Sequence, residues 1–376
     1  MRVVVTGASG SVGTALRRVL RAEAPGVDVL GVARRVPGGG SRDDDPRHAP
    51  DGSRHAPGDP RHAVRDGDPG DVPGRTSWLS CDIGAPSAEA RLAGAFTGAD
   101  AVVHLAWAIQ PGSDEPDMRR TNLDGSGHVL AAARRAGVPH VVVASSIAAY
   151  SPADHPVTED WPCGGVPGSA YSRQKAELER MLEGRADVAV LRPCAVVQPG
   201  AGAELGRWAV SPLFPPALLG RRWLPVPLWS GLRAQVVHAE DVGRAISLIL
   251  RERSTGAFNV ASEQVLGADE LASVLGGFRL PVPLRLLEGL AWPTWRAGVQ
   301  PVHPGWLRLA AQASTVDISR LRSLGWRPRH GPREALAATV AAVARGQGSW
   351  GPLAPRAGGR WRELGWGFPV RQSQGG

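Results

Sequence analysis

Lysine and tyrosine are scarce in this sequence. The 376 residues include 43 lysines and arginines taken together, but Lys175 is the only lysine among them. The two tyrosines are Tyr150 and Tyr171. General surface roles for Lys and Tyr are therefore excluded, and the three that remain are the first candidates for a specific task.

Cysteine is also rare. The sequence has three cysteines, an odd number, and they lie far apart without a CxxC pair: Cys81, Cys163 and Cys194. This spacing argues against a disulfide framework and against a cysteine-based zinc site. We expect the three thiols to be buried structural groups, and we predict no metal ligands.

Long apolar runs are missing as well. Every hydrophobic stretch is interrupted well before the ~18 to 20 residues that a membrane-spanning helix needs. The first residues, MRVVVTG, lack the charged and then apolar layout of a signal peptide. From these absences we expect a cytoplasmic protein without a membrane partner.

The formal net charge is +8, yet the sequence contains no run of five or six cations. Its arginines are scattered in pairs such as Arg17-Arg18 and Arg134-Arg135. Nucleic-acid binding requires cations gathered on one face or stripe. The pattern indicates a solvated surface, and no nucleic-acid partner is predicted.

Strand and helix patterns alternate through the first half of the chain. Apolar runs of strand length occur at residues 3–5, 27–32, 101–106 and 140–145, and segments with helical periodicity lie between several of them, including 14–22 and 122–136. Runs that are apolar throughout are typical of parallel strands buried on both faces. This alternation predicts an α/β fold with a Rossmann-type, doubly wound parallel sheet.

The chain is predicted to divide into unequal parts. Residues 1–193 form the nucleotide-binding core, and residues 194–345 form a small C-terminal substrate-binding subdomain, with about 234–262 returning to the core. Residues 346–376, rich in Gly, Pro and Arg, are expected to be a flexible tail. Helices are expected at 268–275 and 332–344.

Residues 37–76 interrupt the core with Gly, Pro, Asp, Arg and His. A seven-residue repeat places His48, His55 and His62 at equal intervals. Histidine-rich tracts can bind metals, but the prolines and glycines between these histidines prevent a preformed ligand geometry. A disordered insertion is the favoured interpretation.

The first strand is followed by the sequence TGASGSVG, which contains Gly7, Gly10 and Gly13. A glycine-rich turn that opens a helix lets the backbone approach a pyrophosphate, and the helix N-terminus supplies free N–H donors. We therefore predict that Gly7, Gly10 and Gly13 bind a dinucleotide cofactor, and that the turn residues Ser9, Ser11 and Val12 also contact it.

The identity of the dinucleotide depends on the residues about 20 positions further on. An acid at that point binds the 2′-hydroxyl of NAD, whereas an arginine accommodates the 2′-phosphate of NADP. Here the sequence is Ala33-Arg34-Arg35. NADP(H) is therefore favoured over NAD(H), with Arg34 at the phosphate.

Tyr171 and Lys175 are four residues apart in YSRQK. This spacing places them on one face of a helix. A nearby ammonium favours the phenolate and lowers the pKa of a tyrosine, so Tyr171 is a candidate general acid/base.

These motifs together resemble the extended short-chain dehydrogenase/reductase family, the NAD-dependent epimerase/dehydratase group. The resemblance spans about residues 1–345. It rests on TGASGSVG, Asp82-Ile83, His104-Leu105-Ala106-Trp107, Ser145-Ser146 followed by Tyr150, YSRQK, Arg192-Pro193, VHAEDV at 237–242, Phe258-Asn259-Val260 and Leu324-Gly325-Trp326.

The resemblance implies a set of roles. Ser146 would hydrogen-bond the substrate oxygen, Tyr171 would transfer the proton, and Lys175 would lower the pKa of Tyr171 and hold the nicotinamide ribose. Other residues would contact the cofactor: Asp82 and Ile83 at the adenine, and Leu105 and Ala106 along its length. A homodimer formed by paired helices is common among proteins of this kind.

Departures from the family pattern concern the substrate. The Asn-x-x-Gly-Pro type sequence of nucleotide-sugar enzymes is replaced by CAVVQPG at 194–200. We expect the apolar residues that follow to form pocket walls or the core of the subdomain: Trp208, Leu213, Phe214, Leu218, Leu219, Trp223 and Trp229. Arg207, Arg221, Arg222 and Arg233 could instead bind a sugar diphosphate.

Three functions remain open at this point. The favoured one is an NADP(H)-preferring oxidoreductase that acts on a carbonyl or secondary alcohol of a small, fairly apolar molecule. The second is a nucleotide-sugar epimerase or dehydratase with tightly bound NAD. The third is a non-catalytic NADP-sensing regulatory protein, which would have no need of the Ser146, Tyr171 and Lys175 set.

Overall fold

The computed structural model describes residues 1–36, 76–109, 116–209, 211, 214–215 and 218–348. Nearly all of the predicted insertion at 37–76 and most of the predicted tail at 346–376 lie outside these residues. Within the described part of the chain, no helix is long and apolar enough to cross a membrane.

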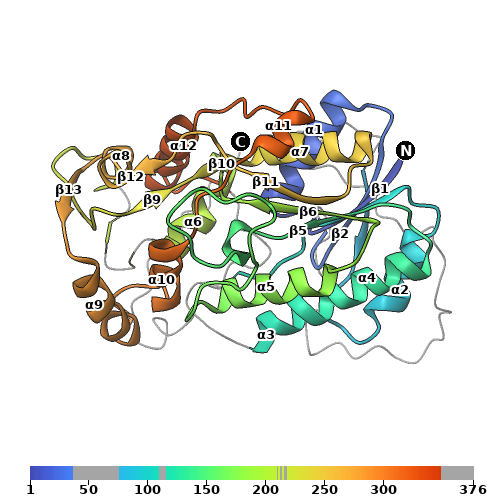
Figure 1. Ribbon diagram of the computed structural model, residues 1–376, viewed down its shortest axis with the longest axis horizontal. Helices are drawn as coiled ribbons and strands as arrows, with labels where there is room; N and C mark the ends of the chain where they lie inside the picture. The colour runs from blue at the N-terminus through green and yellow to red at the C-terminus, as the bar shows by residue number, and fades with distance from the viewer. Residues whose placement is uncertain (37–75, 110–115, 210, 212–213, 216–217, 349–376) are drawn as a thin grey trace, which may run out of the picture.

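A parallel sheet of seven strands occupies the centre of the molecule (Figure 1). Its strand order is β11-β6-β5-β4-β1-β2-β3. The strands are β1 (Arg2–Thr6), β2 (Asp28–Ala33), β3 (Thr76–Ser80), β4 (Ala101–His104), β5 (Val141–Ala144), β6 (Val188–Pro193) and β11 (Gly256–Val260). The order reverses direction between β1 and β4, where the carboxyl ends of the strands leave a crevice for a ligand. The predicted fold class is confirmed.

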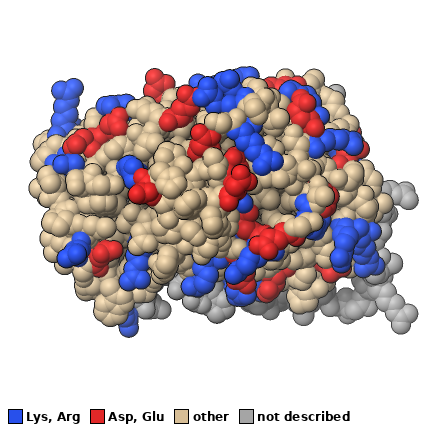
Figure 2. All heavy atoms as spheres, in the orientation of Figure 1, with Lys and Arg blue, Asp and Glu red and all other residues tan. Residues whose placement is uncertain are grey.

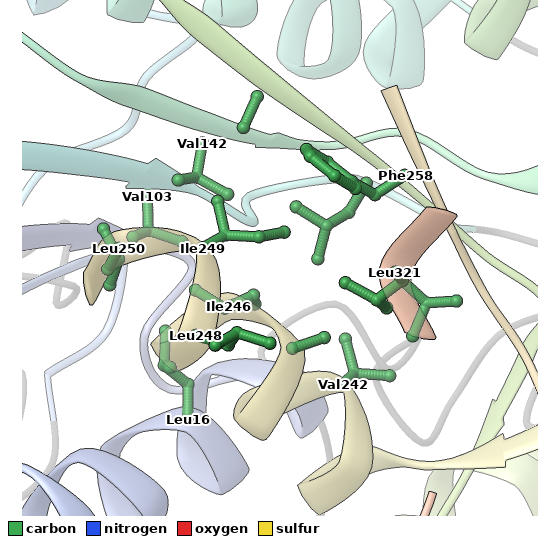
Figure 3. Packing of buried hydrophobic residues seen from close by; sticks show 14 of the residues in the cluster. Leu16, Val103, Val142, Val242, Ile246, Leu248, Ile249, Leu250, Phe258 and Leu321 are labelled. Atoms are coloured by element: carbon green, nitrogen blue, oxygen red, sulfur yellow. The ribbon is translucent and has the colours of Figure 1, made fainter. Parts of the chain in front are cut away.

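Both faces of the sheet are covered by helices, and alternate side chains of each strand point to opposite faces. Val3 and Val5 belong to a buried cluster with α1 and α7, whereas Val4 belongs to the cluster on the other side with α2, α4 and α5. Figure 3 shows the first of these layers, in which Ile246 and Ile249 of α7 lie between α1 and the strands. The strands are therefore apolar on both sides, as the sequence pattern predicts.

The helices of the core are α1 (Ser11–Glu23), α2 (Ala88–Phe96), α3 (Pro116–Arg119), α4 (Gly125–Arg135), α5 (Ala170–Leu182) and α7 (Ala239–Glu252). Two short 3-10 helices, η2 (Ile147–Ala149) and η3 (Pro199–Ala201), border the crevice, and α11 (Ser319–Ser323) lies near β11. The predicted helix at 122–136 differs at its start, because a π-helical turn, η1 (Arg120–Asp124), joins α3 to α4.

The C-terminal part contains α6 (Gly202–Ala209), α8 (Ala268–Val274), α9 (Leu284–Arg296), α10 (Pro304–Gln312) and α12 (Pro332–Ala344). It also contains three two-stranded sheets: β7 (Ala195–Val197) with β10 (Val236–His238), β9 (Arg233–Ala234) with β12 (Leu266–Gly267), and β8 (Pro225–Leu228) with β13 (Phe278–Pro281). These elements lie at the end of the molecule away from β1 and β2 (Figure 1). The boundaries of the predicted domains remain a prediction.

Candidate active site

A cavity of about 650 Å³ opens at the crevice between β1 and β4. All of the residues that the sequence singles out for catalysis or cofactor binding line it: Gly7, Ser9, Gly10, Ser11, Val12, Gly13, Arg34, Asp82, Ile83, Leu105, Ala106, Ser146, Tyr171 and Lys175. The fold therefore brings together, around one space, groups that are up to 168 positions apart in the chain, from Gly7 to Lys175. Their roles remain predictions.

The glycine turn has the geometry that a close ligand requires. Gly7 has a φ of +72°, and a Cβ on it would lie 2.7 Å from the backbone nitrogen of Ala106. A Cβ on Gly13 would overlap the backbone of Gly7 and Ala8. A Cβ on Gly10 would meet only the oxygen of Gly7, at 3.3 Å. Gly7 and Gly13 are thus required by the protein's own packing, while Gly10 keeps the backbone bare at the start of α1.

Several buried polar atoms around the cavity have no partner within the described chain. They are Ser9 Oγ, Trp107 Nε1 and Ser145 Oγ. Buried polar groups of folded proteins are almost always hydrogen-bonded, so a cluster of unsatisfied ones indicates a polar ligand. Together with the bare turn at Gly10, these atoms fit a dinucleotide, whose phosphates would lie at Ser9 and the N-terminus of α1.

Cations surround the place where the adenosine ribose is expected. Arg34 follows β2, and burial together with the charges of Arg35 and Arg120 lowers its pKa, an effect that Asp82 opposes. Arg120 donates to Asp82 Oδ2 at 2.9 Å, and the Gly84 amide donates to Asp82 Oδ1 at 3.1 Å. The Asp82 carboxylate is therefore already held by the protein, and the sequence alone did not identify Arg120.

Tyr171 lies in the first turn of α5, where Ser169 caps the helix by accepting a hydrogen bond from the Ser172 amide. Burial raises the pKa of Tyr171, and a hydrogen bond with Ser146 acts in the opposite direction. Ser146 is itself buried and caps the N-terminus of η2, where its Oγ accepts from the Ala148 amide at 3.1 Å. Before any ligand binds, the phenol therefore stays protonated at neutral pH.

Lys175 lies one turn further along α5 and is almost fully buried. Its Nζ donates to the carbonyl of Ala144 at 2.9 Å and lies 3.4 Å from the centre of the Trp107 ring. Burial lowers the pKa of Lys175 to about 7. In the structure burial raises the pKa of Tyr171 and the hydrogen bond with Ser146 opposes this, so the lowering of this pKa by Lys175 stays a prediction.

Trp306 is a cavity residue that the sequence did not reveal. It belongs to α10, and its ring lies 4.9 Å from the ring of Tyr171, tilted by 31°. Gln198 was also missed, although it lies in the CAVVQPG segment; its Nε2 donates to the backbone oxygen and to Oγ of Ser11. No local pattern could have identified Trp306, which is 135 positions from Tyr171.

The π-helical turn η1 fixes the position of α5. Asn122 is buried, and its Oδ1 accepts from the Ala108 amide at 2.6 Å. Its Nδ2 donates to Ala108 O at 3.0 Å and to Gln174 Oε1 at 2.7 Å. Since Gln174 precedes Lys175 directly, Asn122 connects β4 and its following loop to the helix that carries the predicted catalytic pair.

Of the two roles expected for the apolar residues at 208–229, packing in the core of the subdomain is the one that Phe214 and Leu219 take. Phe214 and Leu219 pack against Leu224 and Val226 in a separate small core, and Trp223 is 62% exposed. Apolar side chains from other segments line the cavity, and they include Ile109, Leu205, Leu232, Val302, Trp306 and Leu309. Residues 204–205 and 232–235 line the cavity together with residues between 302 and 315, and this long-range pairing has no local sequence signal.

Outside the cavity, His238, Glu240 and His330 could together hold a metal ion, since one ligand atom from each lies within 4.8 Å of the others. His238 Nδ1 already accepts a hydrogen bond from the Glu240 amide, however, and the His238 and His330 rings lie 4.0 Å apart. Arg244 supplies the positive charge beside Asp241 at 2.5 Å. These groups belong to an ion-pair network, in which His330 contacts Glu240 and Asp241.

Residues 3–261 match the NAD dependent epimerase/dehydratase family. A 3-diazoavenalumate denitrifying reductase from Streptomyces sp. is 30% identical over 249 residues, which cover 61% of this chain and 76% of the relative.

Solved structures give the same result for the fold. DesIV, a dTDP-glucose 4,6-dehydratase from Streptomyces venezuelae solved with NAD, superposes with a TM-score of 0.62 at 24% identity and covers 94% of this chain and all of its own. UDP-glucose-4-epimerase from Stenotrophomonas maltophila superposes with a TM-score of 0.61 at 21% identity, and the match covers 92% of this chain and 98% of the epimerase. The chain therefore belongs to the NAD-dependent epimerase/dehydratase family and is an NAD-dependent enzyme of the extended short-chain dehydrogenase/reductase type.

Proposed function

We propose that the protein is an oxidoreductase that transfers hydride to or from a carbonyl or secondary-alcohol carbon of a small, fairly apolar molecule. The observation that carries the proposal is the placement of Ser146, Tyr171 and Lys175 in one cavity, with a glycine turn at one side and apolar side chains at the other. Bound NAD(P)H supplies the hydride.

The protonated phenol suits the reductive direction. A carbonyl oxygen next to Ser146 and Tyr171 gains a proton from Tyr171 as the carbonyl carbon gains a hydride, and the product is an alcohol. In the oxidative direction the same groups act in reverse, and Tyr171 must first lose its proton. Because burial raises the pKa of Tyr171, the resting state favours reduction at neutral pH.

The substrate end of the cavity is suited to an apolar molecule. Trp306 and Leu309 of α10 face it together with Leu232 and Val302. Glu204 also lines the cavity, and burial alone raises its pKa. A sugar diphosphate would meet this carboxylate and a single described cation at that end, Arg233, which is exposed. The named activity of the Streptomyces relative, a reductase, supports the same class of reaction.

Two measurements test the proposal. Purified protein is incubated with reduced cofactor and a panel of aromatic and aliphatic ketones and aldehydes, beside UDP- and dTDP-sugars, while the absorbance of the reduced nicotinamide is followed. We expect net oxidation of cofactor with the apolar carbonyl compounds. Conversion of a nucleotide sugar without net cofactor change, by protein that retains stoichiometric NAD after purification, would instead establish the epimerase or dehydratase alternative.

We also propose that the cofactor is NADP(H), because Arg34 and Arg120 lie at the expected ribose site and Ala33 stands where NAD-binding proteins have an acid. Arg34→Ala should weaken NADP(H) binding about tenfold or more while leaving NAD(H) binding almost unchanged. Arg35→Ala is the matched control, since Arg35 does not line the cavity. Equal losses for both cofactors, or no loss, would contradict the preference.

A further inference from the structure

Helix α9 is the most exposed helix of the described chain. None of its residues is buried. Leu286, Leu290 and Trp292 are between 50% and 59% exposed. Leu286 and Leu290 are four positions apart and so lie on the same face of the helix. Side chains of this size normally contribute to a core or an interface when they occur together.

The sheet formed by β8 and β13 exposes further apolar side chains at the same end of the molecule as α9 (Figure 1). Phe278 pairs with Pro225 and Leu280 pairs with Pro227 in the parallel register. All four are exposed, Phe278 at 51% and Leu280 at 45%, while Val226 points the other way into a small core. One face of this sheet is therefore entirely apolar at these positions and has no partner within the described chain.

Cations flank the apolar groups. Arg285 and Arg296 are exposed on α9, and Arg221 and Arg222 are exposed directly before Trp223, which is 62% exposed. None of these four arginines forms an ion pair within the described residues. The single carboxylate of α9 is Glu288. In Figure 2 the lower left, where α9 lies, is mostly uncharged surface interrupted by separate charged groups, most of them cationic.

We propose that this end of the molecule, which we call the α9 surface (residues 221–227 and 278–296), binds the surface of an anionic lipid bilayer. Helices with exposed Leu and Trp beside arginines insert their apolar side at the boundary of headgroups and acyl chains. Each arginine near anionic headgroups adds to the attraction.

Charge selects the bilayer over a second copy of this chain. A symmetric dimer through the α9 surface would bury the same patch of both protomers, so that two copies of these four arginines would be gathered in one interface with only two copies of Glu288. Anionic headgroups supply the opposite charge. The sequence predicted no membrane partner because it contains no long apolar run. The α9 surface is instead assembled from separate short segments, which a search for continuous runs does not detect.

The α9 surface adjoins the cavity through α10. Helix α9 packs against α10, and α10 contributes Trp306 and Leu309 to the cavity wall. The proposal does not depend on the proposed reaction, because it concerns only the outer side of this helical pair.

The test is flotation of the full chain with vesicles of phosphatidylcholine alone and of phosphatidylcholine mixed with phosphatidylglycerol. We expect flotation with the mixed vesicles and less as salt is added, since the attraction of exposed charges is screened. The double variant Leu286→Glu/Leu290→Glu should reduce the vesicle-bound fraction about tenfold or more. Arg285→Gln/Arg296→Gln should reduce it by a smaller factor and remove about half of the salt dependence, because Arg221 and Arg222 remain.

Met181→Glu is the matched control, because Met181 is a 36% exposed apolar residue on α5, outside the α9 surface. It should float like the unmodified chain. Failure of the unmodified chain to bind mixed vesicles, or equal loss in the control, would overturn the proposal. So would a concentration-dependent dimer in lipid-free solution that Leu290→Glu dissociates, because it would assign the surface to a second copy. If the Leu286→Glu/Leu290→Glu variant has a lower melting temperature than the unmodified chain, the vesicle binding of the Arg285→Gln/Arg296→Gln variant tests the proposal instead.

Discussion

The two tyrosines of this protein occupy opposite kinds of environment. Tyr150 is 1% exposed, donates to Asn259 Oδ1 at 2.7 Å and accepts from Arg192 Nη1 at 2.8 Å. Tyr171 borders the cavity and has Ser146 and the ring of Trp306 beside it. The phenol of Tyr150 has its hydrogen bonds filled by the protein, whereas that of Tyr171 faces the space where a substrate can lie.

The difference shows that a raised pKa does not by itself identify a catalytic group. Burial raises the pKa of Tyr150 to about 12, although Arg192 acts against it. Burial raises the pKa of Tyr171 as well. Access to the cavity and the position of Lys175 on the same helix distinguish the two, so geometry decides before pKa does.

The sharpest test of this contrast is Tyr171→Phe. Removal of a general acid or base lowers turnover by about 10²- to 10⁴-fold, and we expect kcat to fall by that factor while cofactor affinity is kept. The melting temperature should change little, because the ring and its packing against Trp306 remain. A Phe variant with normal kcat would overturn the assignment of Tyr171.

The hydrogen bonds around Tyr150 can be disrupted by a substitution of Arg192, which donates to the Tyr150 hydroxyl. Its guanidinium holds Glu179 in a bidentate ion pair at 2.9 and 3.0 Å, and both side chains are buried. Arg192→Met leaves Glu179 unpaired and should lower the free energy of unfolding by about 3 to 5 kcal/mol, measured by urea denaturation.

The control for that variant is Arg119→Met, which removes the exposed pair between Arg119 and Glu177. We expect no measurable change in stability there, because exposed pairs are screened by solvent. Similar losses of unfolding free energy in both variants would mean that burial does not explain the contribution of the Arg192–Glu179 pair to stability.

Tyr150→Phe is the counterpart of the Tyr171 variant. It removes the hydroxyl, so that Asn259 Oδ1 loses a donor and Arg192 Nη1 loses an acceptor. This should lower the free energy of unfolding by about 1 to 2 kcal/mol. Turnover under folding conditions should remain near that of the unmodified protein. A large loss of kcat with unchanged stability would place Tyr150 in the catalytic machinery and erase the contrast.

The smallest predicted effect concerns pH. Lys175 has a pKa of about 7 before ligand binds, so it is charged below that pH and neutral above it. The charged form attracts an anionic dinucleotide, and affinity for NAD should therefore fall by about three- to tenfold from about pH 6 to about pH 8. Titration calorimetry measures this; Lys175→Met should give weaker binding with little pH dependence.

Local spacing was sufficient to predict part of the site. Gly7, Gly10 and Gly13 lie in one turn, and Tyr171 and Lys175 lie one helical turn apart, so a few consecutive residues determine how each set is arranged. The strands of the sheet were equally visible, because burial on both faces makes them apolar throughout.

Long-range contacts could not be predicted in this way. Trp306 reaches Tyr171 only after α10 packs across the cavity, and Glu204 enters through α6. The apolar run at 211–219 resembles a pocket wall in sequence, yet Phe214 packs into a different cluster. Hydrophobicity indicates that a residue will be covered, but not by which distant segment.

The π-helical turn at 120–124 has a consequence for how this enzyme can be altered. A π turn is equivalent to one residue inserted into an α-helix. Deleting Thr121 would restore regular winding without rotating α3 relative to α4, because the π turn absorbs the additional residue. The winding per residue would change at Asn122 itself, so its bonds to Ala108 and Gln174 would be displaced. A single-codon deletion would thus leave the flanking helices in register and act on the attachment of α5 alone, and loop exchange in this region must preserve residue count as well as residue type.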